Sequence, residues 1–210
     1  MLAAGMLTLP EFFAQLYANT DTDADPASGG RQMNCHFATR LLDEDGNWLD
    51  NTQTKNSSAD ISPTGGQMGR LVGLALSSKL YRNNTDLEYL KNFSVNGNEV
   101  AFGTIGNAST SEGIFFESIN AAGVLQVPMA ISIWDDAYGI SVPAEYQTTK
   151  QDISEILKGF QRDDKGEGYE IFKVRGWDYP GLCETYEKAI KICRDQHIPV
   201  MIHVTEMTQP

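Results

Sequence analysis

The stretch from residue 100 to residue 139 constrains the fold more than any other part of this 210-residue chain. It contains an apolar strand at 100–105, a sharp turn at Gly106, a helix, and a second apolar strand at 129–134. A strand that is followed by a helix and a returning parallel strand forms a βαβ unit. Such units bind their ligands at the carboxyl ends of the strands. The sequence therefore predicts an α/β fold with a ligand site at these two strand ends.

Both strand ends carry a polar residue with a side-chain oxygen. Asn107 follows the first strand, and Asp136 follows the second. An amide oxygen, a carboxylate oxygen and a nearby backbone carbonyl would complete half an octahedron, and phosphates and water would supply the rest, as Mg²⁺ prefers. The alternative is that Asn107 forms an Asx-turn and that Asp135 and Asp136 are a solvated strand exit. The spacing alone leaves both interpretations open.

The turn after the first strand has properties that suit a diphosphate. Gly106 lets the backbone turn where a Cβ atom would obstruct it. Ser109, Thr110 and Ser111 offer N-cap hydroxyls, and Ser109 with Glu112 has the spacing of a capping box. The start of a helix presents free N–H groups and a partial positive charge. These features predict an anion site at the helix start.

The run from Gly106 to Tyr138 resembles the thiamine diphosphate motif of the 2-oxo acid dehydrogenases, in particular the alpha subunit of their decarboxylating component. Members usually carry Gly-Asp-Gly or Gly-Glu-Gly at the first turn and Asn-Asn-x-Tyr at the second. The resemblance implies Mg²⁺ ligands at Asn107, at Asp136 and at the backbone oxygen of Tyr138. It implies contacts with the cofactor at Gly106, Ala108, Ser109 and Tyr138.

This chain departs from the family pattern at both side-chain ligands. The family's acid is replaced by Asn107, and the family's amide is replaced by Asp136. The two exchanges together leave one carboxylate and one amide facing the cation, so we expect Mg²⁺ binding to survive. The competing interpretation is a structural or regulatory subunit that keeps the fold and the partner surface but no longer binds metal.

Three further segments carry the resemblance. Residues 30–37 (GRQMNCHF) resemble the Gly-Arg-Gln-Met-x-x-His-Tyr segment of the branched-chain members, and residues 141–150 (SVPAEYQTTK) resemble their Ser-Thr-Pro-x-x-x-Gln continuation. Residues 61–67 (ISPTGGQ) resemble a turn whose backbone holds the aminopyrimidine of thiamine, which implies cofactor contacts at Ser62 and Thr64. The alternative for this turn is a plain Pro-Gly turn at a helix start.

The remaining pattern completes an α/β fold. Apolar runs at 171–174 and 200–204 predict two more strands, and a helix that starts at Pro180 is expected to turn Cys183 and Cys193 towards its packed side. Four apolar strands that alternate with helices predict a mainly parallel sheet with helices on both faces. We expect residues 1–210 to form one thiamine diphosphate-binding domain, cropped from a longer chain at both ends.

Composition excludes several classes of function. The formal net charge of −12 argues against a nucleic-acid surface, which needs a basic face. No apolar stretch reaches the length of a transmembrane helix, so no membrane partner is expected. The three cysteines lack the spacing of a metal site and indicate reduced thiols in the cytoplasm.

The resemblance also implies an activity and its partners. It implies oxidative decarboxylation of a branched-chain 2-oxo acid, with transfer of the acyl group to a lipoyl group on an acyltransferase core. Pyruvate and acetoin dehydrogenases are the nearest enzymatic alternatives. In the family the beta subunit supplies the glutamate that activates the cofactor, so we assign no catalytic residue to this chain. A beta subunit, or the beta half of a fused chain, is the expected partner.

Overall fold

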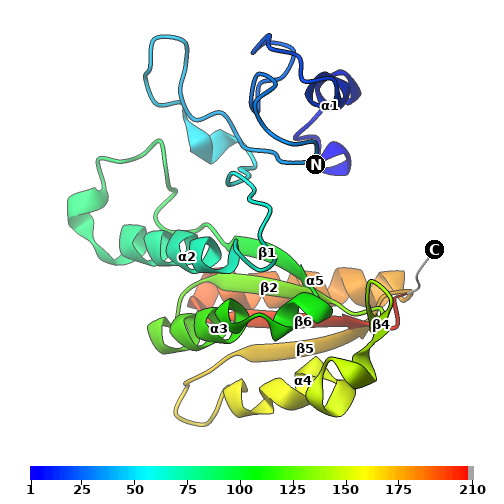
Figure 1. The fold of residues 1–210 in the computed structure, drawn as a ribbon. Helices are drawn as coiled ribbons and strands as arrows, with labels where there is room; N and C mark the ends of the chain where they lie inside the picture. Colours follow the sequence, from blue (N-terminus) through cyan, green and yellow to red (C-terminus); the bar gives the residue numbers. More distant parts are fainter. Residues whose placement is uncertain (208–210) are drawn as a thin grey trace. The chain divides into compact units, whose positions relative to one another are not determined.

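The computed structural model describes residues 1–207, which form two compact units (Figure 1). The first unit consists of Met1–Ser62 and Tyr89–Val95, and the second consists of Pro63–Glu88 and the described chain from Asn96 on. The expectation of one thiamine diphosphate-binding domain over residues 1–210 stays a prediction. Within residues 1–207, no helix is both long enough and apolar enough to span a membrane.

The first unit is built mainly from loops around one short helix. Its helical elements are η1 (Leu2–Ala4), α1 (Leu9–Leu16) and η2 (Asn51–Gln53). At the start of α1 the Thr8 side chain accepts the N–H of Glu11, and the Glu11 carboxylate accepts the N–H of Thr8, which is a complete capping box. Residues 42–48 form a small hairpin, in which Leu42 and Trp48 make an antiparallel bridge.

The second unit contains the predicted sheet. Its strands are β1 (Ala101–Gly106), β2 (Met129–Trp134), β5 (Glu170–Arg175) and β6 (Val200–Thr205). Their order is β1-β2-β6-β5, and every neighbouring pair is parallel. A separate two-stranded hairpin consists of β3 (Tyr138–Gly139) and β4 (Val142–Pro143). The four predicted strands are therefore confirmed.

Helices cover both faces of the sheet, as Figure 1 shows. The α-helices are α2 (Met68–Asn83), α3 (Gly113–Leu125), α4 (Ile153–Ile156) and α5 (Tyr179–Gln196), and the 3₁₀ turns are η3 (Thr85–Leu87), η4 (Ala108–Ser111), η5 (Ala144–Tyr146), η6 (Thr149–Gln151) and η7 (Leu157–Phe160). Helices α2 and α3 lie on one face, and α5 lies on the other. The prediction of a mainly parallel sheet between two helical layers is confirmed.

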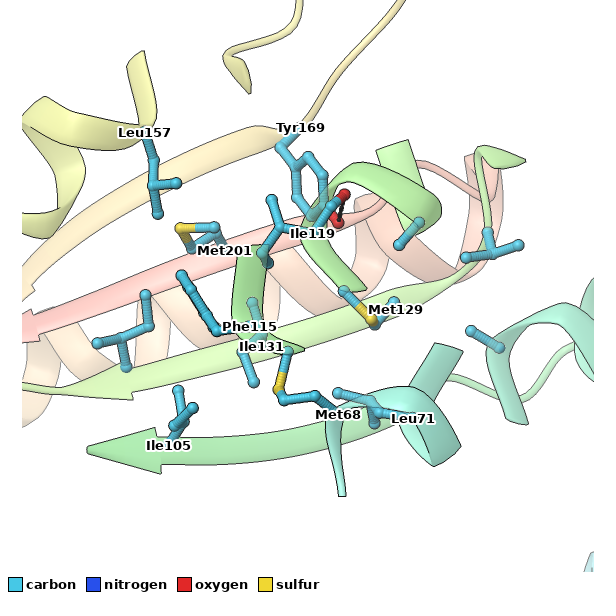
Figure 2. Close-up of a cluster of buried hydrophobic side chains, with 14 of the residues drawn as sticks. Met68, Leu71, Ile105, Phe115, Ile119, Met129, Ile131, Leu157, Tyr169 and Met201 are labelled. Carbon is cyan, nitrogen blue, oxygen red and sulfur yellow. Dashed lines mark hydrogen bonds between the residues drawn. The ribbon is translucent and has the colours of Figure 1, made fainter. Parts of the chain in front are cut away.

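The main core lies between the sheet and the helices α2 and α3. Figure 2 shows Phe115 and Ile119 of α3 together with Met68 of α2, close to Ile131 of β2. Phe115, Ile119 and Ile131 are fully buried, and each buried side chain of this size contributes about 1.5–3 kcal/mol relative to an exposed one. The hydroxyl of Tyr169 donates to the carbonyl oxygen of Ile119 at 2.8 Å, so its one polar atom is satisfied.

One detail of helix α5 differs from the prediction. The helix starts at Tyr179, with Pro180 in its first turn and the Asp178 side chain accepting the N–H of Gly181 at 3.1 Å. Cys193 is buried against the sheet, but Cys183 is exposed. The expectation for Cys183 was wrong because ten positions turn a helix to a point about 80° away from the starting face.

Candidate functional site

The ends of β1 and β2 lie next to each other at the carboxyl edge of the sheet. Gly106, the last residue of β1, pairs in parallel register with Trp134, the last residue of β2. The backbone N–H of Asn107 donates to the carbonyl oxygen of Trp134 at 3.0 Å. The turn that contains Asn107 and the turn that contains Asp136 therefore leave the sheet side by side.

The turn after β1 is longer than the sequence pattern indicates. Asn107 starts the 3₁₀ turn η4, where its carbonyl oxygen accepts both the N–H and the hydroxyl of Thr110. Helix α3 then begins at Gly113 with Glu112 in the N-cap position. The capping box expected from Ser109 and Glu112 does not form, because the 3₁₀ turn uses the Ser109 carbonyl oxygen to accept the N–H of Glu112 at 3.2 Å.

Asn107 is a buried amide whose hydrogen-bonding capacity is incompletely used. Its side chain is 4% exposed, and its Nδ2 atom has no hydrogen-bond partner within residues 1–207. A buried donor without a partner costs about 1–3 kcal/mol. Two consecutive residues after β4 also have a buried side-chain atom without a hydrogen-bond partner within residues 1–207. These atoms are Oε1 of Gln147 and Oγ1 of Thr148. A buried polar atom without a partner calls for a physical explanation, and a bound ion, a water molecule and a catalytic role are among the usual ones.

The turn after β2 is stabilised by two consecutive Asx-turns. One carboxylate oxygen of Asp135 accepts the N–H of Ala137 at 2.9 Å, and one of Asp136 accepts the N–H of Tyr138 at 3.0 Å. Ala137 adopts a left-handed conformation with φ of 66°. Asp135 is not the solvated strand exit of the alternative interpretation, because its side chain is only 13% exposed.

Gly139 brings the two turns into contact. A Cβ atom at Gly139 would lie 2.8 Å from the Cβ atom of Ala108 and 2.6 Å from Oε1 of Gln147, so no larger residue fits without a shift. The hairpin of β3 and β4 therefore lies directly against η4. Tyr138, whose carbonyl is the predicted third metal ligand, is the residue next to this contact.

The segment that contains Thr64 also approaches this region. Gly65 has φ of 70°, and a Cβ atom there would lie 3.2 Å from Cγ2 of Ile114 and 3.5 Å from Cβ of Glu112, at the start of α3. The turn at 63–66 thus lies against the element that follows η4. Ser62 belongs to the first unit, where its hydroxyl lies 3.0 Å from Nε2 of His36.

A buried hydrogen-bond network at the same edge was missed by the sequence analysis. His203 of β6 is 1% exposed, and its Nε2 atom lies 2.9 Å from Oδ2 of Asp135. Its Nδ1 atom lies 2.6 Å from the hydroxyl of Ser154 and 3.7 Å from Oδ1 of Asp152, which also binds Lys173. The only signal in the sequence is a histidine within an apolar strand, which does not identify its partners.

The network keeps the Asp135 carboxyl group ionised. Burial opposes ionisation, but the hydrogen bonds with His203 and with the N–H of Ala137 outweigh it, so the pKa of Asp135 lies below its ordinary value. Burial likewise opposes ionisation of Asp152, but the hydrogen bond from Lys173 lowers its pKa overall. Because Asp135 binds β6 through His203, the network also fixes the end of β2 that carries Asp136.

A magnesium ion held by this edge of the sheet stays a prediction. Over residues 1–207, no three His, Cys, Asp or Glu side chains form a group that could hold a metal ion. The predicted set of Asn107, Asp136 and the Tyr138 carbonyl is of another type, with one carboxylate and two neutral oxygens. The assignment of Gly106, Ala108 and Ser109 to the diphosphate stays a prediction.

Comparisons with known proteins identify the family of the chain. The family model described as "Dehydrogenase E1 component" matches residues 1–207. The alpha subunit of 2-oxoisovalerate dehydrogenase from Bacillus subtilis (strain 168) is 30% identical over 138 residues, which is 65% of this chain and 33% of that protein. The chain thus spans about a third of the length of this curated relative.

A solved structure supports the fold. Transketolase from Campylobacter jejuni subsp. jejuni NCTC 11168 superposes with a TM-score of 0.50 at 18% sequence identity, over 71% of this chain and 20% of that chain. At this level of identity the similarity concerns the fold alone. The predicted α/β fold with a mainly parallel sheet is confirmed by this neighbour.

Proposed function

The chain belongs to the dehydrogenase E1 component family, and from this premise we propose that it acts in the alpha subunit of a thiamine diphosphate-dependent 2-oxo acid dehydrogenase. The family resemblance that the sequence indicates is thereby confirmed. The observation that carries the proposal is the buried amide of Asn107, whose Nδ2 atom has no partner within the described chain at the edge where β1 and β2 end together.

The exchanged ligands fit a magnesium diphosphate. The Oδ1 atom of Asn107, a carboxylate oxygen of Asp136 and the carbonyl oxygen of Tyr138 would hold Mg²⁺. The Nδ2 atom of Asn107 would then donate to a diphosphate oxygen, which the carboxylate of the usual family pattern is unable to do. Moving the acid to Asp136 keeps one negative charge at the cation, and the neutral Asn107 gains a donor for the cofactor.

Other residues of the chain would position the cofactor. The turn at 106–109 would present backbone N–H groups to the diphosphate, and the close packing of Gly139 on Ala108 would hold that turn against the residue that supplies the carbonyl ligand. Thr64 would contact the aminopyrimidine from a turn that packs on the start of α3. Thiamine diphosphate itself supplies the nucleophilic carbon and the electron sink for loss of CO₂.

We further propose a branched-chain 2-oxo acid as the substrate. The support is the name of the Bacillus subtilis relative and the segment at 30–37, which resembles the branched-chain members. A beta subunit or a fused beta half would supply the glutamate that activates the cofactor, and a lipoyl acyltransferase core would accept the acyl group. Pyruvate and acetoin remain the nearest alternative substrates.

Calorimetric titration of the full-length protein with Mg²⁺ and thiamine diphosphate tests the metal site. We expect binding that depends on Mg²⁺ in the natural protein. We also expect binding to be retained in the double variant Asn107→Asp with Asp136→Asn, because the charge at the cation is unchanged. Failure of the natural protein to bind, together with binding by the double variant, would contradict the proposal and favour a subunit that has lost its metal.

Turnover assays that follow the reduction of an electron acceptor test the substrate, because acetoin has no carboxyl group to lose. The full-length protein with its partner would be supplied with branched-chain 2-oxo acids, pyruvate and acetoin in separate reactions, with an artificial electron acceptor. The highest kcat/KM is expected for a branched-chain acid. Turnover of none of these substrates, together with no Mg²⁺-dependent cofactor binding, would support the second candidate, a non-catalytic structural or regulatory subunit that no longer binds metal. The departure from the family pattern at Asn107 and Asp136 is the feature that raises this candidate.

A further inference from the structure

The second unit has a cavity of about 400 Å³ at the amino-terminal edge of the sheet, opposite the candidate cofactor site. Its wall is formed by residues at the ends of α2, α3 and α5 and by the segments that lead into β2, β5 and β6. The lining residues are Lys79, Arg82, Asn83, Gln126, Arg162, Gln196, His197 and Ile198. The six-residue strands separate the two edges by about 20 Å.

The charge of this wall differs from the charge of the whole chain. Three of the lining residues, Lys79, Arg82 and Arg162, are permanently cationic, and none is acidic. The chain as a whole carries 28 acidic and 16 basic residues. The lining of this cavity is therefore basic, although the chain as a whole is acidic.

Helix termini balance only part of this charge. The ammonium group of Lys79 donates to the carbonyl oxygen of Leu125, the last residue of α3. The guanidinium of Arg82 donates to the carbonyl oxygens of Arg194 at 3.0 Å and Asp195 at 3.3 Å, in the last turn of α5. Each helix C-terminus carries about −0.5 charge, so the ends of α2, α3 and α5 supply about −1.5 against three positive charges. The carboxylate of Asp195 balances more of it, since the charge of Arg82 contributes to lowering the pKa of Asp195.

The guanidinium of Arg162 is oriented by a neutral side chain, which does not cancel its charge. Its Nη1 atom donates to Oε1 of Gln126 at 3.2 Å. The amide nitrogen of Gln126 in turn donates to the carbonyl oxygens of Gly123 at 2.6 Å and Gly168 at 3.2 Å, so the side chain that orients Arg162 is itself fixed. A guanidinium that is oriented by a neutral amide keeps its full charge for a ligand.

His197 supports the view that the local potential is positive. It caps α5 in a left-handed conformation with φ of 54°, is 7% exposed, and donates from Nε2 to the carbonyl oxygen of Gly97 at 2.9 Å. Burial is the main cause that lowers its pKa, and the hydrogen bond to Gly97 opposes it. The charges of Arg82 and Lys79 lower the pKa further, against a smaller opposite effect of Glu99.

We propose that this cavity binds a small phosphate-bearing anion at a site separate from the cofactor site, with Lys79, Arg82 and Arg162 as its cationic contacts. Two guanidinium groups and one ammonium group match the charge and hydrogen-bonding geometry of phosphate oxygens. The volume lies within the range of small-ligand pockets, about 300–1,000 Å³. Ligands of open parallel sheets usually bind at the opposite edge, so this site does not follow from the fold.

Equilibrium dialysis with radiolabelled pyrophosphate tests the proposal. The full-length protein is used at constant ionic strength and without magnesium, so that the candidate cofactor site lacks its cation. We expect pyrophosphate to bind, and we expect Arg82→Gln and Arg162→Gln each to weaken binding at least tenfold. The control Lys158→Gln removes an exposed cation that pairs with Glu155 in another part of the unit, and its affinity should match that of the natural protein.

The outcomes are decisive in both directions. Absence of pyrophosphate binding by the natural protein overturns the proposal, and so does equal binding by the natural protein and Arg162→Gln. The guanidinium of Arg162 donates to the side chain of Gln126 and not to a helix end, so this variant remains informative if the loss of Arg82 unfolds the end of α5. Citrate serves as a carboxylate competitor: displacement of pyrophosphate at equal concentration would overturn the assignment to phosphate, and competition at least tenfold weaker would support it.

Discussion

The candidate sites at the two edges of one sheet carry side chains of opposite charge. At the carboxyl edge, Asp135 and Asp136 directly follow β2, whereas at the amino edge Lys79, Arg82 and Arg162 surround a cavity. The helices between parallel strands run back across the sheet, so their positive ends lie at the carboxyl edge and their negative ends at the amino edge. The side chains at each edge therefore complement the backbone dipoles. The two sites also differ in kind, since one contains a buried amide whose Nδ2 atom has no partner within residues 1–207 and the other is a cavity lined by three basic side chains.

The largest expected effect is the loss of the only carboxylate in the predicted metal site. Asp136→Ala should lower the affinity for thiamine diphosphate with Mg²⁺ about 100-fold or more, since even groups outside the coordination sphere often contribute 10- to 100-fold. Calorimetry on the full-length protein measures this affinity. Glu187→Ala removes an exposed acid of α5 and should leave it unchanged. If Asp136→Ala and Glu187→Ala bound thiamine diphosphate with equal affinity, Asp136 would not be a ligand of the metal.

Breaking the network behind the carboxyl edge should lower stability. His203→Leu leaves the partly buried Asp135 carboxylate without its main partner, at a cost of about 2–3 kcal/mol in the free energy of unfolding. Urea unfolding measures the change. The double variant with Asp135→Ala should cost less than the sum of the single changes. Additive costs would mean that the two side chains do not interact as the structure indicates.

A methyl group at the contact between the two turns should have a smaller effect. Gly139→Ala places a Cβ atom 2.8 Å from Ala108, so we expect a destabilisation of about 1–2 kcal/mol and weaker cofactor binding. Thermal unfolding and calorimetry measure both effects. Gly159→Ala is the matched control, because no atom lies within 4 Å of its added Cβ and its φ is not positive. The steric interpretation fails if the two variants behave alike.

The smallest expected effect concerns pH at the amino edge. The pKa of folded His197 is below its ordinary value of 6.5, so the unfolded chain takes up the proton more readily. The free energy of unfolding should therefore fall as the pH decreases through 6.5 towards the folded pKa. His197→Asn keeps a residue that tolerates the left-handed cap and should reduce this slope. An unchanged slope in denaturant titrations at several pH values would show that His197 is not responsible.

Periodicity predicted the sheet well because apolar runs with clear boundaries identify buried strands. The run from Met129 to Trp134 has the same bounds in the sequence and in the structure, and the polar residues after it mark the strand end. The turn after β1 was predicted less well. Its Ser and Thr residues suit an N-cap and a 3₁₀ turn equally, so the order of η4 and α3 depended on packing that the local sequence does not encode.

Long-range partners account for most of what the sequence did not reveal. His203 and Asp135 are separated by 68 positions, and only the parallel pairing of β2 with β6 brings their strand ends together. The amino-edge cavity assembles cations from α2 and from the segment before β5, which no spacing rule connects. Both features depend on strand order, and the apolar pattern of the strands does not determine that order.

The tight packing of Gly139 on Ala108 has an evolutionary consequence. Residue volumes at positions 108 and 139 are constrained jointly, so a larger side chain is tolerated at one position only with a smaller one, or a displaced loop, at the other. The amide Asn107 lies one residue before Ala108, and the acid Asp136 lies three residues before Gly139. A redesign of cofactor binding in this chain would therefore have to change residues 106–109 and 136–139 together.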